Sequence, residues 1–270
     1  MTHSEGISAT AMLPAWSATG NPTHDLPSWT REFAANESAI ASRSFHCDEL
    51  VGDCLSALAR DAFDQVLKEL PAGPCRVWAF LPRPTDPDCD ALDRYMRFNI
   101  GRTSAYEANT QRVRVIPAGT CVGHFATNLV VHALWVDGPI EAIENPRQRP
   151  AWQYSNRYGP VPPAFTRGMR ASKVLIASGT AAVVGEDSVH ENSLTLQFEE
   201  SIQNLAALAA AAGSSSPWRS LQIYVRDERN LVSVRALAQE HFGAHVERVV
   251  NAPLCRRELL LEIEGVCDVS

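Results

Sequence analysis

Residues 191–212, ENSLTLQFEESIQNLAALAAAA, contain the clearest helical pattern in the chain. Apolar side chains recur every three or four positions, as on one buried helix face, at Leu194, Leu196, Phe198, Ile202, Leu205 and Leu208. Gly213 and the serines after it end the pattern. Before this helix, residues 172–185 predict paired strands around Gly179. After it, the pattern predicts a second helix at 230–243 and strands at 220–226, 245–250 and 258–266.

The first half of the chain shows the same order of elements. Helices are predicted at 48–70 and 88–108, the second broken or ended near Gly101, and strands at 76–82, 111–117 and 128–136. Both halves therefore have the order helix, strand, helix, strand, strand. This repetition predicts an α+β fold of two related lobes, with mixed β-sheets and helices packed on one face of each. The free face of each sheet would then pack against the other lobe or another subunit.

This pattern divides the chain into three segments. We expect an irregular leader at 1–26, an N-terminal lobe at 27–144 and a C-terminal lobe at 145–270. The leader has neither a basic head nor an apolar core, so it is not expected to be a secretory signal. No apolar run approaches the about 18–20 residues of a membrane helix, which predicts no membrane association.

Composition narrows the functional classes. The 270 residues carry a formal net charge of −7, which argues against a broad nucleic-acid surface because phosphates require a positive field. Seven cysteines at scattered spacings predict reduced thiols and a cytoplasmic location. Only two of the cationic side chains are lysines, and arginine can bind a carboxylate through two parallel hydrogen bonds.

No acidic residue lies between Glu144 and Glu186, although this stretch holds five arginines and one lysine with interleaved aromatic residues and prolines. One interpretation is a surface loop whose arginines pair with acids elsewhere. A second is a single-stranded nucleic-acid platform, which the overall charge disfavours. The third, which we prefer, is a stiffened pocket for a small polyanion, with arginines as charged donors and tyrosines as hydroxyl donors.

Two further stretches carry candidate site residues. In residues 94–102, RYMRFNIGR, helical spacing places Tyr95 and Arg102 on one face, either as a solvated surface or as part of a site. In residues 258–266, ELLLEIEGV, alternation places Glu262 on the same side as Glu264. That side faces either solvent or a cleft in which a partly desolvated carboxyl can hold a proton near neutral pH.

Common cofactor and metal motifs are missing from the sequence. It contains no HExxH, GxSxG, GxxxxGK or GxGxxG, and no set of cysteines and histidines has zinc-finger spacing. We therefore expect neither a cofactor nor a metal.

Three blocks of sequence together resemble the chorismatases. They are NPRQRPAWQYSNRYGPVPPAFTRGM at 145–169, SGTAAVVGEDSVHENSLTLQFEESIQNLAAL at 178–208 and CRRELLLEIEG at 255–265. The resemblance covers about residues 90–270, and the part from Ala171 onward also resembles the RidA (YjgF) fold. It implies two RidA/YjgF-like, chorismate mutase-like lobes that cleave chorismate, releasing pyruvate without metal or cofactor.

The resemblance also implies roles for individual residues. Glu262 matches the catalytic acid that protonates the enolpyruvyl methylene group. Tyr95, Arg102, Tyr154 and Arg167 match substrate-binding positions, with the arginines holding the two carboxylates of chorismate.

Two positions are associated with the product. Gly168, directly after FTR, and Cys255, seven residues before the acid, match the members that form 3-hydroxybenzoate. A glycine at position 168 would make room in the site, and the thiol of Cys255 could exchange a proton with a ring intermediate or add to it transiently.

Other interpretations stay open at this point. Other members form a dihydroxycyclohexadiene carboxylate or a mixture of 3- and 4-hydroxybenzoate. The fold would also suit a RidA-like enamine or imine deaminase, or a sensor that binds chorismate without consuming it. Two fused lobes would allow a pseudo-trimeric monomer as well as a homo-oligomer.

Overall fold

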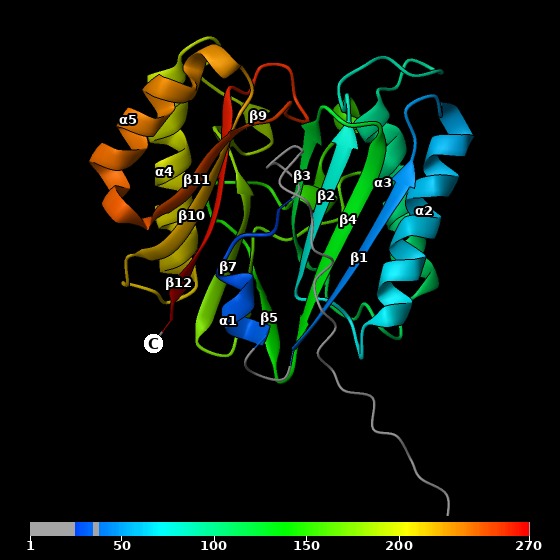
Figure 1. Cartoon of the computed structure of the whole chain (residues 1–270), viewed down its shortest axis with the longest axis horizontal. Helices are drawn as coiled ribbons and strands as arrows, with labels where there is room; N and C mark the ends of the chain where they lie inside the picture. Colours follow the sequence, from blue (N-terminus) through cyan, green and yellow to red (C-terminus); the bar gives the residue numbers. More distant parts are fainter. Residues whose placement is uncertain (1–24, 35–37, 270) are drawn as a thin grey trace, which may run out of the picture.

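Two β-sheets face each other across the centre of the molecule, and helices cover their outer faces (Figure 1). The computed structural model describes residues 25–34 and 38–269. A short helix, α1 (Thr30–Ala34), precedes the first sheet. This sheet has the order β1-β4-β2-β3. Its elements in chain order are β1 (Ser38–His46), α2 (Gly52–Glu69), β2 (Arg76–Pro82), α3 (Arg94–Ala108), β3 (Ala118–His124) and β4 (Asn128–Val136).

The second sheet has six strands in the order β11-β10-β12-β7-β6-β5. Its elements are β5 (Ile140–Ile143), β6 (Gly168–Ala171), β7 (Val174–Thr180), α4 (Leu194–Ala211), β10 (Trp218–Val225), α5 (Leu231–Phe242), β11 (Val246–Asn251) and β12 (Leu261–Asp268). A two-stranded ribbon, β8 (Val183–Val184) and β9 (Asp187–Ser188), lies between β7 and α4.

The topology contains the same unit twice. In the first sheet β2 and β3 are parallel, and β4 is antiparallel to both β1 and β2. In the second, β10 and β11 are parallel, and β12 is antiparallel to both β7 and β10. The unit strand, helix, strand, helix, strand, strand therefore occurs from β1 to β4 and again from β7 to β12. The predicted α+β class, with mixed sheets and helices on one face of each, is confirmed.

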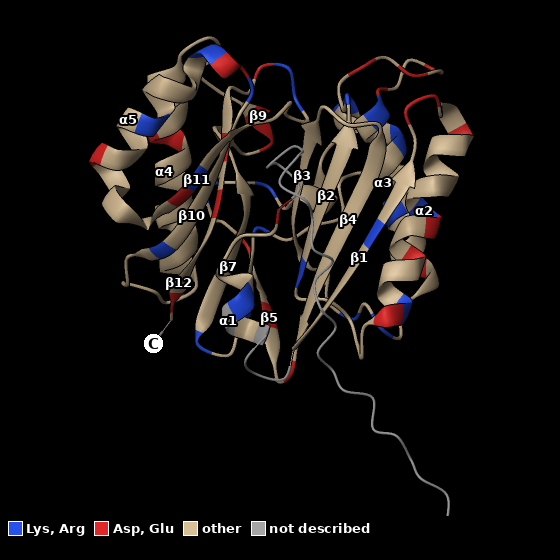
Figure 2. Cartoon of the chain, in the orientation of Figure 1, with Lys and Arg blue, Asp and Glu red and all other residues tan. Residues whose placement is uncertain are grey.

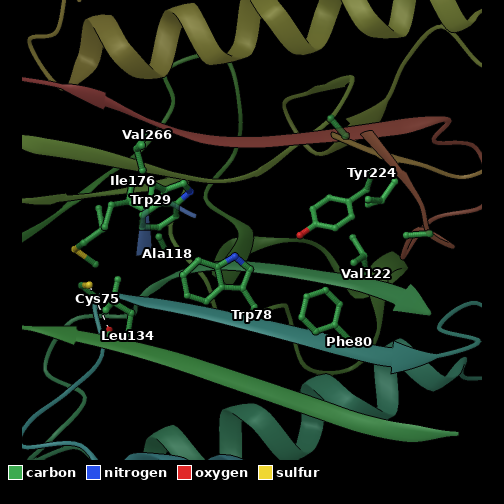
Figure 3. Close-up of a cluster of buried hydrophobic side chains, with 14 of the residues drawn as sticks. Trp29, Cys75, Trp78, Phe80, Ala118, Val122, Leu134, Ile176, Tyr224 and Val266 are labelled. Carbon is green, nitrogen blue, oxygen red and sulfur yellow. Dashed lines mark hydrogen bonds between the residues drawn. The ribbon is translucent and has the colours of Figure 1, made fainter. Parts of the chain in front are cut away.

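The core between the sheets is apolar but encloses one ion pair. Trp78 and Phe80 of β2 and Tyr224 of β10 meet there with side chains from both sheets (Figure 3). Arg76, which is fully buried, forms an ion pair with the buried carboxylate of Glu264. The charged residues visible in Figure 2 lie mainly on helices and loops. Burial of their inner faces therefore holds the two sheets together. The sequence pattern predicts this, because a sheet with helices on one face has to bury its other face against another element.

Helix α3 is placed by two local features. The Asp93 carboxylate caps its first turn by accepting from the backbone N–H of Met96 at 2.7 Å. Gly101 lies inside the helix and does not break it. A Cβ at this position would lie 2.1 Å from the carbonyl oxygen of Ser56 in α2, so glycine permits close contact between the two helices.

Several predicted boundaries differ from the structure. Residues 111–117 are not a strand, because their apolar side chains, Val113, Val115 and Ile116, pack a loop against the core. The strand is β3, whose small residues hide its pattern. Strand β1 was not predicted, because it is a half-exposed strand with few apolar residues. Residues 1–24 of the predicted leader lie outside the described residues. The boundary at 144 stays a prediction, although β5 pairs within the second sheet.

Candidate active site

A cavity of about 290 Å³ lies where the two lobes meet, close to the lower end of the usual range for small-molecule sites. Helix α3, strand β3, the loop before β6, strand β7, the segment before β12 and β12 itself contribute to its wall. The lining residues include six of the seven predicted site residues: Tyr95, Arg102, Tyr154, Arg167, Cys255 and Glu262. Segments that are up to 167 positions apart in sequence are therefore brought to one site.

Glu262 provides the carboxyl group of the cavity. It lies on the inner face of β12, paired with Tyr224, and is 9% exposed. Burial, reinforced by the negative charge of Glu264, raises the pKa of Glu262 to about 8, although Arg76 and Arg167 oppose the shift. The neutral acid therefore predominates at pH 7, so Glu262 can donate a proton.

Helix α3 contributes a buried cation to the cavity. The Arg102 guanidinium donates one hydrogen bond, at 2.6 Å, to the side-chain oxygen of Asn99. Its Nε–H group is buried and has no hydrogen-bond partner among the residues that the structure describes. Tyr95 lies seven residues earlier on the same face of this helix, and its ring stacks on that of Phe98. A buried guanidinium with an unused donor is suited to an anionic ligand.

The loop before β6 contributes a second such cation. Arg167 is 5% exposed, donates to the Tyr154 hydroxyl, and donates to the carbonyl oxygen of Arg149 at 2.9 Å. The Arg167 Nε–H group also has no hydrogen-bond partner among residues 25–34 and 38–269. The cavity therefore presents a cation from each lobe, together with the neutral carboxyl of Glu262.

Most other cations of the acid-free stretch pair with acids elsewhere. The ion pairs are Arg147 with Glu200, Arg149 with Glu186, Arg157 with Asp187 and Arg170 with Glu141. The interpretation as a surface loop thus holds for these four arginines. The pocket interpretation is supported for Arg167, which lies near the middle of the stretch and lines the cavity.

Cys255 lies at the cavity wall next to β3. Its Sγ–H donates to the carbonyl oxygen of Cys121 at 2.9 Å. Burial raises the pKa of Cys255 well above its ordinary value, so the group is a thiol and not a thiolate at neutral pH. This protonation state favours proton exchange over nucleophilic addition.

Gly168 is not brought to the cavity. It comes directly after Arg167 at the start of β6 and therefore points to the opposite face. A Cβ at this position would lie 3.0 Å from a methyl carbon of Leu175 and 3.3 Å from those of Leu208, beneath helix α4. The expectation that this glycine makes room in the site needs correction, since the space it provides is in the core.

Three contributors to the cavity were not predicted from the sequence. Arg256 lies over the Tyr158 ring, with its Cζ 3.9 Å from the ring centre, and both residues line the cavity. The position of Arg256 next to Cys255 was the only available signal. Gly179 lies within β7, where paired strands were expected to turn, and its backbone touches the carboxyl of Glu262.

The duplicated fold places this cavity, with its neutral carboxyl and buried cations, between the two repeats. The family model described as "Chorismatase FkbO/Hyg5-like, N-terminal" matches residues 14–135, the part in which the sequence motifs are weakest. A 3-hydroxybenzoate synthase of Streptomyces hygroscopicus is 32% identical over 211 residues, or 71% of this chain and 62% of that protein. A chorismatase of Streptomyces rapamycinicus is 29% identical, covering 71% of this chain and 63% of that protein.

A crystal structure of a chorismatase has the same fold, with a TM-score of 0.77 at 24% identity, covering 86% of this chain and 75% of that one. The chain belongs to the chorismatase family. It spans less than two thirds of the length of these two curated Streptomyces relatives. Among residues 25–34 and 38–269, no helix combines the length and apolar character needed to cross a membrane.

Proposed function

We propose that the chain cleaves chorismate into pyruvate and 3-hydroxybenzoate. The observation that carries this proposal is the neutral, buried Glu262 carboxyl in a cavity that two buried arginines, Arg102 and Arg167, also line. Chorismate matches this arrangement chemically, because it combines two carboxylates with an enol ether that is cleaved after protonation on carbon.

The reaction begins with a proton transfer from Glu262 to the methylene carbon of the enolpyruvyl group. This step moves the positive charge to the ether carbon, giving an oxocarbenium-like centre, and leaves Glu262 as a carboxylate. The new carboxylate lies in the field of Arg76, Arg167 and Arg256, all of which favour its charged form. The C3–O bond of the ring ether then breaks, with its electron pair going to the oxygen of the released pyruvate. The C4 hydroxyl oxygen bonds to C3 as its C4–O bond breaks, and the hydrogen on C3 leaves as the proton that returns to Glu262 and makes the ring aromatic.

The two arginines bind the substrate. Arg102 and Arg167 come from different lobes, so each can hold one carboxylate while the ring ether lies near Glu262. Tyr154 supports this arrangement, because its hydroxyl accepts a hydrogen bond from Arg167 and orients the guanidinium.

The identity of the second product depends on the fate of the ring once pyruvate has been released. 3-Hydroxybenzoate and pyruvate together contain every atom of chorismate, whereas the diene product requires one added water. The Cys255 thiol supports the aromatic product, since it can exchange a proton with a ring intermediate at the cavity wall. The relative named 3-hydroxybenzoate synthase is consistent with this choice.

The proposal is tested by incubating the purified protein with chorismate. Pyruvate is measured by coupled reduction with lactate dehydrogenase, and ring products are separated by chromatography. We expect equal amounts of pyruvate and 3-hydroxybenzoate. Absence of pyruvate would overturn the activity, and a diene product would overturn the subtype. Release of ammonia from an enamine, with chorismate unchanged, would favour a deaminase instead.

The pH dependence of this activity is set by Glu262. Because its folded-state pKa is about 8, the acid is protonated below that pH and is lost as the pH rises through it. We expect kcat/KM to be level near neutral pH and to fall about tenfold for each pH unit above about 8. Steady-state rates and circular dichroism spectra, both measured across this pH range, distinguish the fall in kcat/KM from unfolding. A limb near the ordinary carboxyl pKa would contradict the assignment.

The position of Gly168 leads to a prediction about stability. In Gly168→Ala, the added methyl meets Leu175 and Leu208, so we expect unfolding free energy to fall by about 1 kcal/mol. The ratio of ring products should not change, because the methyl points away from the cavity. Urea unfolding and product chromatography measure the two effects. A changed product ratio at unchanged stability would restore the direct role of this position.

A further inference from the structure

Strand β7 contains a β-bulge beside the site. Thr180 pairs with Ile263, and Ala177 pairs with Gly265. Two residues of β7, Ser178 and Gly179, therefore lie opposite the single residue Glu264 of β12. Bulges commonly re-aim side chains next to active sites.

The bulge is attached to the other lobe through β3. The backbone N–H of Gly119 donates to the Ser178 hydroxyl at 2.8 Å. The backbone N–H of Gly179 donates to the Thr120 hydroxyl at 2.9 Å. These two contacts cross the boundary between the sheets in opposite directions, so they hold the bulge at a defined distance from β3.

The Glu262 carboxyl rests directly on this bulge. A Cβ at Gly179 would lie 1.7 Å from the Glu262 Oε1 and 2.6 Å from its carboxyl carbon. No side chain fits between them, and any movement of the Gly179 backbone moves the surface against which the carboxyl packs.

Thr120 uses its full hydrogen-bonding capacity at this point. Its hydroxyl donates to the Glu264 carboxylate, and it accepts from Gly179 and from the Arg76 guanidinium. A hydroxyl has one donor and two acceptor sites, so all three are occupied. The side chain is 2% exposed, which leaves no water to replace a lost partner.

We propose that Thr120 is a positioning residue for the Glu262 acid: its hydroxyl anchors the Ser178–Gly179 bulge, and the bulge sets where the carboxyl lies in the cavity. This inference rests on the proposed function for its kinetic readout. It assigns to the first lobe a role in orienting an acid that the second lobe carries.

The first test compares Thr120→Val with Thr120→Ser in the pyruvate assay. Valine keeps the volume but removes all three hydrogen bonds, and we expect kcat to fall about 10- to 100-fold with KM changed less than about threefold. Serine keeps the hydroxyl and should restore kcat to within about threefold of wild type. Thr30→Val is the matched control, since Thr30 is equally buried and its hydroxyl bonds only Pro27 in the segment before α1. Equal kcat values for Thr120→Val and wild type, or equal losses in the valine and serine variants, would overturn the inference.

The second test does not depend on chorismate. Carbon-13 NMR of labelled glutamate monitors the titration of the Glu262 carboxyl in wild type, Thr120→Val, Thr120→Ser and Gly179→Ala, with Glu262→Gln used to assign the signal. We expect the serine variant to titrate as wild type does, and the valine and alanine variants to show a displaced chemical shift and midpoint. If Thr120→Val titrates like wild type, the hydroxyl does not position the acid, and if Gly179→Ala titrates like wild type, the bulge does not position it. Wild-type protein that releases no pyruvate overturns the proposed function, and the titrations then decide the inference alone.

Discussion

Glu262→Gln is expected to lower kcat for chorismate cleavage by about 10²- to 10⁴-fold, the range that a general acid contributes. Glutamine has the size of glutamate and fits the same space against Gly179. It cannot donate the proton that the methylene carbon requires. Because the wild-type carboxyl is already neutral below its pKa of about 8, the substitution removes no charge, and chorismate affinity should change less than about threefold. Rapid-quench kinetics and calorimetric titration measure the two quantities.

Glu258→Gln is the matched control for this result. Glu258 lines the same cavity and precedes β12 by three residues, but it lies at the partly exposed end of the wall. We expect its kcat to stay within about threefold of wild type, because Glu258 precedes β12 and is not the carboxyl that lies against Gly179. Near-normal turnover in Glu262→Gln, or an equal loss in both variants, would show that the acid has been assigned to the wrong residue.

The sequence was sufficient to find the face of β12 on which Glu262 lies, but it could not tell whether that face was covered. Alternation in residues 258–266 is a local property of the strand. Strands β2 and β3 cover Glu264, and the Thr120 contact with Glu264 joins residues 144 positions apart. Whether this face of β12 meets solvent or a cavity depends on how the two lobes are arranged. The sequence pattern of neither lobe contains that information.

The repeated element order was predictable for a related reason. Buried helix faces and core strands have strong periodicity, so both repeats could be recognised. Strand β3, with glycines at two of its positions, and the β7 bulge have no such pattern. These irregular elements form part of the cavity wall, so the parts of the fold closest to the proposed chemistry were the hardest to predict from the sequence. Tyr95, Arg102, Tyr154 and Arg167 were assigned through resemblance to a family, and periodicity alone left each of them as a possible surface residue.

Arg102→Met is expected to raise KM for chorismate about 30- to 700-fold, equivalent to about 2–4 kcal/mol of lost binding. Methionine retains most of the apolar stem of the side chain, so the principal loss is the buried guanidinium. That group is 3% exposed, lines the cavity and donates to the Asn99 side chain, and its positive charge can pair with a substrate carboxylate. We expect kcat to change less than KM, because proton donation by Glu262 does not involve this arginine. Initial rates over a wide chorismate range separate the two constants.

Arg170→Met tests whether any lost arginine has this effect. Arg170 lies three residues from Arg167 but pairs with Glu141 on the exposed side of β6, where ion pairs contribute little to stability or binding. Its KM should stay within about twofold of wild type. Thermal unfolding of both variants checks that the Asn99 contact is not needed for folding. Equal KM values in Arg102→Met and wild type would mean that the carboxylate is bound elsewhere in the cavity, whose lining also includes Arg167, Arg256 and Arg257. A rise in both variants would mean that overall charge, and not a directed contact, attracts the substrate, and lowering the ionic strength would then strengthen binding to each in the same proportion.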